Sequence, residues 1–108
     1  MSETGNWVRV AAVGDVVEGS AIPVEIGELN LAIYHLAGGE FHCTDNICTH
    51  AFAILTDGWL EGCMIECPLH AGQFDVRTGR GQGDPIETDL KTFPIRVEGA
   101  DLMVLLPA

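Results

Sequence analysis

The chain has 108 residues, of which 47% are hydrophobic and 19% charged, so it can build one compact core and is not a disordered chain. Its 16 acidic and 5 basic residues give a formal net charge of −11. This charge argues against nucleic acid and anionic membranes as partners and suits a partner that carries a basic patch.

Short strand-like segments follow one another along the chain. They are predicted over residues 7–12, 21–26, 29–36, 40–44, 63–66, 73–76, 92–98 and 102–106. Turn signals separate them at Gly27-Glu28, Gly38-Gly39, Thr78-Gly79 and Gly99-Ala100. No segment predicts an amphipathic helix longer than two turns. We therefore expect a single all-β domain over 1–108, a barrel or a sandwich.

The expected cellular compartment decides what the cysteines are expected to do. The first five residues lack the basic start and apolar stretch of a secretory signal, and the longest apolar run, 102–106, is too short to span a bilayer. We therefore expect a cytoplasmic protein. Its four cysteines are then ligands, redox groups or buried thiols rather than a disulfide framework.

Two segments, 45–58 and 67–72, interrupt the strand pattern, and each contains a cysteine and a histidine. The first has Cys48-Thr49-His50 and the second has Cys67-Pro68-Leu69-His70, a C-x-H and a C-x-x-H motif with sixteen residues between them. Each loop thus supplies one thiolate and one imidazole, a donor set that suits zinc or an iron–sulfur centre. Four unrelated residues rarely form such mirrored pairs. A structural zinc site usually pairs cysteine with cysteine and histidine with histidine, whereas each pair here is mixed.

The two motifs resemble the signature of Rieske [2Fe–2S] proteins. Residues 44–50, 57–62 and 66–75 are similar to the small Rieske ferredoxins of bacterial aromatic ring-hydroxylating dioxygenase systems, of the naphthalene and biphenyl type, and the similarity runs from about 7 to 106. The resemblance implies that Cys48 and Cys67 bind the inner iron of one [2Fe–2S] cluster. It implies that His50 and His70 bind the outer iron.

The resemblance also implies a fold. The family combines an antiparallel β barrel or sandwich base with a small cluster-binding subdomain, formed here by loops of about 45–58 and 67–72. A third loop of about 83–86, containing Gly83-Asp84-Pro85, would cover the cluster.

The implied function is that of a soluble one-electron carrier rather than an enzyme, with no catalytic residue. Electrons would come from an NADH-dependent flavin reductase and pass to the terminal oxygenase of an aromatic ring-hydroxylating dioxygenase. We expect a cytoplasmic monomer with no nucleic-acid or membrane partner. One alternative is a small Rieske subunit of a larger enzyme, such as assimilatory nitrite reductase, and a more remote one is a structural zinc module.

Departures from respiratory Rieske proteins predict a low reduction potential. Those proteins carry a further cysteine in each ligand loop, joined as a disulfide, where this chain has Ala53 and Leu69. They also donate hydroxyl hydrogen bonds from a Ser and a Tyr, where this chain has Gly72 and Phe74. Missing donors stabilise the reduced cluster less.

The remaining cysteines and histidines fall outside the ligand pattern. Cys43 and Cys63 are interpreted as buried free thiols on strands. His35 and His42 are interpreted as polar histidines on a strand face.

Four hydrophobic residues lie near the ligand motifs. Trp59 and Phe74 are expected to pack under the ligand loops. For Phe52 and Leu69, an apolar rim at which a partner docks and simple core filling both remain open.

Overall fold

The computed structural model describes residues 5–48, 53–68, 72–82 and 89–107. In chain order these form β1 (Gly5–Ala12), η1 (Val13–Asp15), β2 (Ser20–Ile26), β3 (Leu29–Leu36), β4 (Glu40–Asp45), η2 (Leu55–Asp57), β5 (Trp59–Glu61), β6 (Met64–Glu66), β7 (Gln73–Asp75), β8 (Arg80–Gln82), β9 (Thr92–Phe93), β10 (Ile95–Glu98) and β11 (Asp101–Pro107). The two η elements are single turns of 3-10 helix, and the described part of the chain contains no α-helix. The expected all-β fold class is confirmed.

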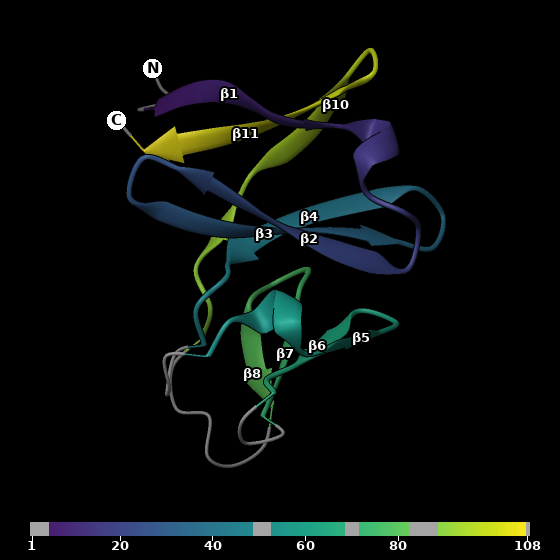
Figure 1. Cartoon of the computed structure of the whole chain (residues 1–108), viewed down its shortest axis with the longest axis vertical. Helices are drawn as coiled ribbons and strands as arrows, with labels where there is room; N and C mark the ends of the chain where they lie inside the picture. The colour runs from purple at the N-terminus through teal and green to yellow at the C-terminus, as the bar shows by residue number, and fades with distance from the viewer. Residues whose placement is uncertain (1–4, 49–52, 69–71, 83–88, 108) are drawn as a thin grey trace.

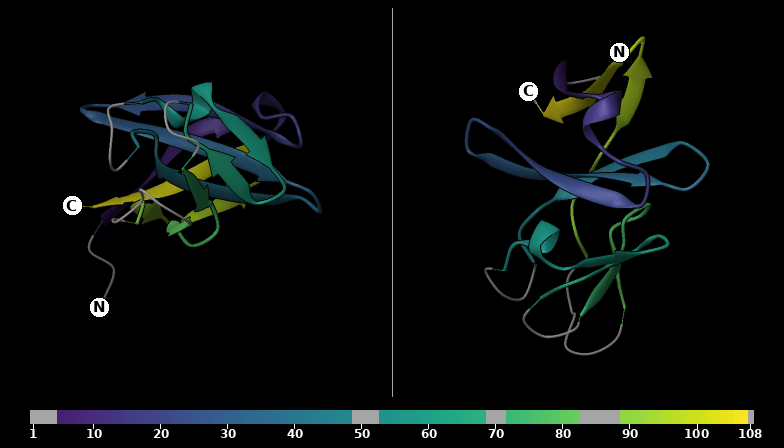
Figure 2. Two further views of the ribbon diagram at one scale, coloured as in Figure 1. Left: turned by 90° about the horizontal axis from the view of Figure 1, so that it is seen from below. Right: turned by 45° about the vertical axis from the view of Figure 1, so that its right-hand side comes forward.

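Three antiparallel sheets lie one above another (Figures 1 and 2). Their strand orders are β1-β11-β10, β2-β3-β4-β9 and β5-β6-β7-β8. The first two form the base of the molecule, and the third, which we call the site sheet, lies at the opposite end from the chain termini (Figure 1). The site sheet joins the two segments that carry the Cys and His motifs.

Strand β3 separates two hydrophobic cores because its side chains alternate between the two faces of the middle sheet. Leu31 and Ile33 point into a core shared with the first sheet, which we call the base core. Ala32, Tyr34 and Leu36 point into a second core shared with the site sheet, which we call the site core. A strand buried on both faces is a nearly continuous apolar run, as this one is in sequence.

The site core contains the candidate cysteine ligands. Its buried residues are Ala32, Tyr34, Leu36, Cys48, Ala53, Leu55, Ile65, Cys67, Phe74, Val76 and Leu90. One face of the middle sheet therefore shares this core with the cysteines that begin the two ligand loops.

Most predicted strands are confirmed, with differences that have physical causes. The single strand predicted over 92–98 is two strands in different sheets, because Pro94 lacks the N–H group that a continuous ladder would need. β9 pairs with β4, and β10 pairs with β11. Strands β5 and β8 were not predicted, since each has three residues and little alternation of its own.

Among the described residues, no helix has the length and apolar character needed to cross a membrane.

Candidate metal centre

An equivalent backbone hydrogen bond closes each of the two Cys-containing loops. The N–H group of Cys48 donates to the carbonyl of Ala53 at 2.9 Å, and the N–H group of Cys67 donates to the carbonyl of Gly72 at 2.7 Å. In each loop the acceptor lies five positions after the cysteine. The residues just outside also pair, Ile47 with Ile54 in an isolated bridge and Glu66 with Gln73 in the β6–β7 ladder. The mirrored motifs in the sequence thus correspond to two loops of equal span.

Both cysteines belong to the site core. Cys48 and Cys67 are buried, and they belong to the same group of packed residues. The described ends of their loops lie together at the end of the molecule that carries the site sheet (Figures 1 and 2). One soft sulfur donor from each loop, shielded from water on its core side, fits an iron–sulfur centre.

Asn46 fixes the start of the first loop. Its side chain is fully buried and accepts a hydrogen bond from the N–H of Thr56 at 2.9 Å. Its Nδ2 group donates to Thr56 Oγ1 at 3.0 Å and to Asn30 Oδ1 at 3.3 Å. Backbone bonds from Asn46 N–H to Asn30 and from Leu55 N–H to Asn46 run beside them. Asn46 thereby ties both ends of the loop to the middle sheet.

Sequence reasoning did not identify this role of Asn46. A single polar residue between a strand and a cysteine carries no periodic signal. A buried asparagine stands out only once its burial is known, because buried amides need hydrogen-bond partners.

A second buried polar pair lies on β3 and β4, just before the same loop begins. The Thr44 hydroxyl donates to the carbonyl of Asp45 at 2.8 Å, so the Tyr34 hydroxyl is the donor in its 2.9 Å bond to Thr44 Oγ1. Burial raises the pKa of the Tyr34 phenol, so it remains a neutral donor. The pair fixes the end of β4 where the first loop begins.

Close backbone contact joins the end of the first loop to the start of the second. Gly58 follows η2, and a Cβ atom built there would lie 1.9 Å from the carbonyl oxygen of Glu66. Glu66 directly precedes Cys67. Only glycine allows this approach, so Gly58 sets the spacing between the two loops.

The remaining cysteines lie elsewhere. Cys43 points into the base core, and burial, with a smaller contribution from the nearby Asp45 carboxylate, raises the pKa of its thiol to about 12. It remains a neutral thiol at physiological pH, as predicted. The prediction was wrong for Cys63, which is half-buried and lies in the β5–β6 turn rather than on a strand. Its carbonyl accepts a hydrogen bond from Val76.

The two spare histidines lie on strands and hold polar contacts, as predicted. His35 Nδ1 lies 2.8 Å from the carbonyl oxygen of Val16, and its ring stacks on Phe41 at 4.1 Å between centroids. His42 Nε2 lies 3.2 Å from a carboxylate oxygen of Glu40.

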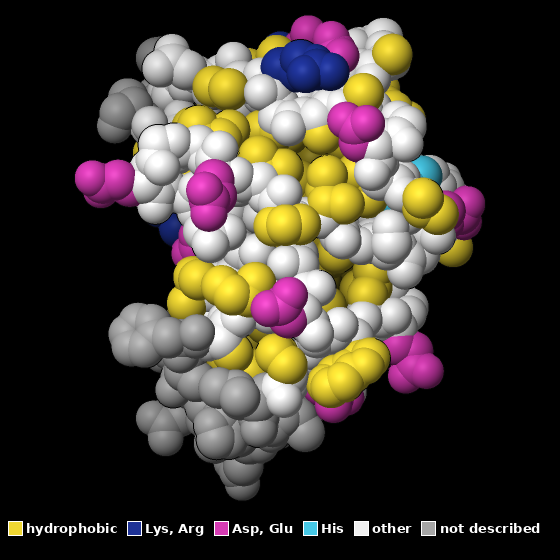
Figure 3. Space-filling model, viewed as in Figure 1, with side chains coloured by type: hydrophobic (Ala, Val, Ile, Leu, Met, Phe, Trp, Pro, Cys, Tyr) yellow, Lys and Arg dark blue, Asp and Glu magenta, His cyan; other side chains and the backbone are white. Residues whose placement is uncertain are grey.

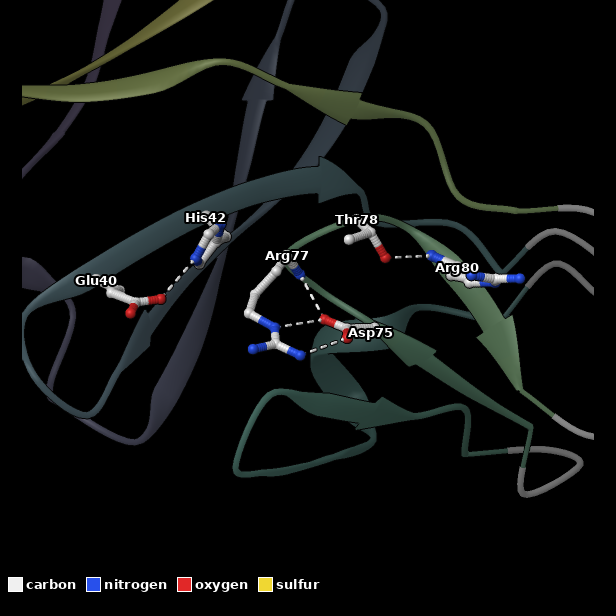
Figure 4. A network of polar contacts seen from close by, with 6 residues as sticks. All are labelled: Glu40, His42, Asp75, Arg77, Thr78 and Arg80. Atoms are coloured by element: carbon white, nitrogen blue, oxygen red, sulfur yellow. Dashed lines mark hydrogen bonds and ion pairs between the residues drawn. The ribbon is translucent and has the colours of Figure 1, made fainter.

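Figure 4 shows the Glu40–His42 pair on β4 near the end of β7, where Asp75 and Arg77 form a two-bond ion pair of 2.8 and 3.0 Å. The guanidinium of Arg77 lowers the pKa of the Asp75 carboxyl. The pair closes the turn between β7 and β8.

The two aromatic residues that were expected beneath the ligand loops differ in their exposure to solvent. Phe74 is fully buried in the site core, as predicted. Trp59 is 59% exposed, so the packing prediction for it was wrong. β5 is an edge strand, and its burial pattern turns Leu60 toward the site core and leaves Trp59 and Glu61 exposed.

Several predicted site residues lie outside the described residues. They are His50, His70, Phe52, Leu69 and the segment Gly83-Asp84-Pro85. The ligand roles of the two histidines, the apolar rim and the covering loop therefore remain predictions.

Comparison with known proteins agrees with this architecture. The family model of the Rieske [2Fe-2S] domain matches residues 6–94. The ferredoxin component of the naphthalene 1,2-dioxygenase/salicylate 5-hydroxylase systems of Ralstonia sp. is 43% identical over 101 residues, 94% of this chain and 96% of the relative.

Two solved structures extend the comparison. The Sphingomonas yanoikuyae B1 ferredoxin superposes with a TM-score of 0.88 at 38% identity, over 94% of this chain and all of the other. A chain from the complex of reduced oxygenase and oxidized ferredoxin in carbazole 1,9a-dioxygenase gives a TM-score of 0.85 at 36% identity, over 92% of each chain.

Proposed function

This chain belongs to the Rieske [2Fe–2S] domain family, and from that premise we propose that it carries single electrons to the terminal oxygenase of an aromatic ring-hydroxylating dioxygenase system. It is an electron-transfer component and not itself the oxygenase. Its cofactor is one [2Fe–2S] cluster, which supplies one-electron chemistry when bound. The family assignment replaces the zinc-module alternative.

The observation that carries the proposal is the pair of equal loops, each beginning at a buried cysteine. Cys48 and Cys67 are proposed to hold the inner iron, on the side of the site core, where hydrophobic packing excludes water from the thiolates. His50 and His70 are proposed to hold the outer iron. Two neutral imidazoles in place of two thiolates raise the reduction potential above that of all-cysteine clusters, an effect for which Rieske centres are the standard example.

The proposed ligand set also explains why the protein is a carrier. Two thiolates and two imidazoles complete the coordination of both irons, so no open position remains for oxygen or substrate. The proposed domain is the whole chain, 1–108, with cluster loops of about 45–58 and 67–72 and a covering loop of about 83–86.

The finer partner assignments belong to the proposal. Electrons are proposed to arrive from an NADH-dependent flavin reductase, and the protein is proposed to act as a cytoplasmic monomer. The net charge of −11 supports encounters with basic partner surfaces. A small subunit of a nitrite reductase would instead remain in a stable complex, and the relatives 42–43% identical to this chain are ferredoxin components.

Reconstitution tests the proposal. The purified protein is combined with NADH and the reductase and terminal oxygenase of the Ralstonia naphthalene system, and cis-dihydrodiol formation is measured. We expect product only when this chain is present, and loss of product when it is replaced by the Cys48→Ser variant. A second relative, the ferredoxin component of the 2,4-dinitrotoluene dioxygenase system of Burkholderia sp., is 42% identical and supplies an independent assay system. A cluster-loaded protein that supports no turnover with either system would refute the assignment.

A further inference from the structure

One face of the site sheet is open to solvent. Strand register places Leu60, Ile65 and Phe74 in one row facing the site core. The neighbouring row, which alternation turns to the opposite face, contains Trp59, Glu66, Gln73 and Gln82, and this row lies beside the start of the second ligand loop. Trp59 is thus the one aromatic side chain in a polar row that also contains Glu66, the residue directly before Cys67.

Acidic side chains surround this tryptophan. Glu66 is its direct cross-strand partner, and Gln73 Nε2 donates to Glu66 Oε1 at 3.4 Å, which holds the carboxylate on this face. Glu61 lies two residues further along β5 on the same face and is exposed. We call Trp59, Glu61 and Glu66 the Trp59 patch.

Neither cross-strand neighbour of Trp59 and Glu61, which are Glu66 and Met64, is basic. Its sequence contains neither Lys nor Arg between residues 10 and 76. Of the nearest basic residues in sequence, Arg77 is paired with Asp75. Arg80 shares the face of Trp59 by strand register, but it lies on β8, at the opposite edge of the sheet from β5. Among the side chains coloured in Figure 3, the lower half of the visible face shows acidic and hydrophobic groups without Lys or Arg.

The other tryptophan shows what such a patch can hold. The guanidinium of Arg96 lies 4.0 Å from the centre of the Trp7 ring and also forms an ion pair with Glu98. An indole and a carboxylate together thus hold one arginine within this molecule. The Trp59 patch has the same two kinds of group, and no cation among the described residues lies over its ring.

We propose that the Trp59 patch is a docking site for the terminal oxygenase, which would place an arginine or lysine against the Trp59 ring and its flanking carboxylates. The inference rests on the proposed function and adds a named contact to it. The oxygenase is the chosen partner because a similar chain has been solved in a complex of oxygenase and ferredoxin. Exposed tryptophans are typical energetic anchors of interfaces, and a cation over an indole contributes most once it is shielded from water.

The test measures binding and turnover with the terminal oxygenase of the Ralstonia naphthalene system. Trp59→Ala should weaken binding of the oxidised, cluster-loaded protein about tenfold or more, and Trp59→Phe should have a smaller effect. In steady-state turnover, Trp59→Ala should raise the KM for this protein and leave kcat unchanged. The visible spectrum and reduction potential should not change, because the side chain faces away from the site core.

Two controls show whether the effect is specific to the Trp59 patch. Val97→Ala removes another exposed hydrophobic side chain, 49% exposed, on β10 at the opposite end of the molecule, and should leave binding unchanged. Glu61→Lys should weaken binding to the oxygenase more than Glu28→Lys, which lies in the β2–β3 turn.

Failure of the proposed docking site and failure of the proposed function give different results. Unchanged oxygenase binding by Trp59→Ala, or a loss confined to the reductase, would overturn the docking site while leaving the carrier function in place. Failure of the wild-type protein in turnover would instead contradict the proposed function.

Discussion

Asn46 holds the two described ends of the first ligand loop through hydrogen bonds. Its buried amide forms three side-chain hydrogen bonds, two of them to Thr56 and one to Asn30. An unsatisfied buried amide or hydroxyl costs free energy because water cannot replace the lost partner. The loop that begins at Cys48 is therefore held by polar contacts as well as by the hydrophobic packing of the site core.

Replacing Asn46 tests this anchor. Asn46→Ala should lower the free energy of unfolding by about 2–3 kcal/mol. The substitution leaves the N–H of Thr56 without its acceptor and removes the two hydrogen bonds that the Asn46 Nδ2 group donates to Thr56 and Asn30. Amide hydrogen exchange should accelerate most at Leu55 and Thr56. Asn30→Ala is the matched control, since it removes only the 3.3 Å bond and should cost less than about 1 kcal/mol. Equal losses from both substitutions would contradict the role of Asn46.

Phe74 tests the origin of the low potential. Its ring is buried in the site core with Cys67 and has no hydroxyl to donate. We expect a wild-type potential of about −150 mV, at the low end of the Rieske range. Phe74→Tyr should raise it if the new hydroxyl donates toward the cluster, as measured by spectroelectrochemical titration. A wild-type potential well above zero would contradict the dioxygenase assignment.

Among single residues, the sequence predicted those that belong to the repeated Cys and His motifs. It did not predict residues outside a motif, such as Asn46 and Gly58. The mirrored motifs pointed to Cys48 and Cys67, and both are buried at the starts of equivalent loops. Asn46 and Gly58 act through burial and close backbone approach, and neither property is visible in a single sequence. Trp59 is expected to pack under the ligand loops, but on the edge strand β5 its side chain faces solvent.

The two ligand loops depend on the elements that flank them. η2 and β5 follow the first loop, and β6 leads into the second. Gly58 lies between η2 and β5 and contacts the backbone of Glu66 at the end of β6. The relative position of the loops is thus set by backbone contact between neighbouring elements.

Substitution of Gly58 should disturb this arrangement. Gly58→Ala places a methyl group 1.9 Å from the Glu66 carbonyl, so the protein should lose about 3 kcal/mol of stability and retain less cluster. Gly14→Ala is the matched control, because a Cβ at Gly14 meets nothing within 4 Å, and its effect should be within about 0.5 kcal/mol. For both variants, stability is measured by thermal unfolding and cluster content by iron analysis. An unaltered iron content in Gly58→Ala would show that the loops do not need this contact.

At the element scale, strands with strong alternation were predicted well and short ones were not. β3 was predicted with its observed bounds because it is a long apolar run between two turn signals. The break between β9 and β10 follows from Pro94, which was included in a single predicted strand. β5 and β8 exist because β6 and β7 offer them ladder partners, a tertiary cause that local pattern cannot show.

The whole molecule combines a three-layer β scaffold with a strongly acidic surface. The candidate centre lies at the end opposite the chain termini (Figure 1), where the site sheet carries the two cysteine loops. A carrier that must bind and release partners quickly benefits from charge steering more than from a large interface.

Salt should therefore slow electron transfer. Turnover with reductase and oxygenase should fall as ionic strength rises from about 10 mM to about 0.5 M, because the screening length shrinks several-fold. The rate is followed by product formation at subsaturating concentrations of this protein. Insensitivity to salt would indicate an apolar contact, and Phe52 and Leu69 would then be the next residues to mutate.

We propose that Cys48, His50, Cys67 and His70 hold one [2Fe–2S] cluster, and replacement of each cysteine by serine separates the two proposed cysteine ligands from the other two cysteines. Iron, acid-labile sulfide and the visible spectrum are measured for wild type and for the four Cys→Ser variants. We expect two irons and two sulfides per chain in wild type, Cys43→Ser and Cys63→Ser, and loss of the native cluster in Cys48→Ser and Cys67→Ser. Retention of the cluster in Cys48→Ser together with its loss in Cys43→Ser or Cys63→Ser would show that the ligand assignment is wrong.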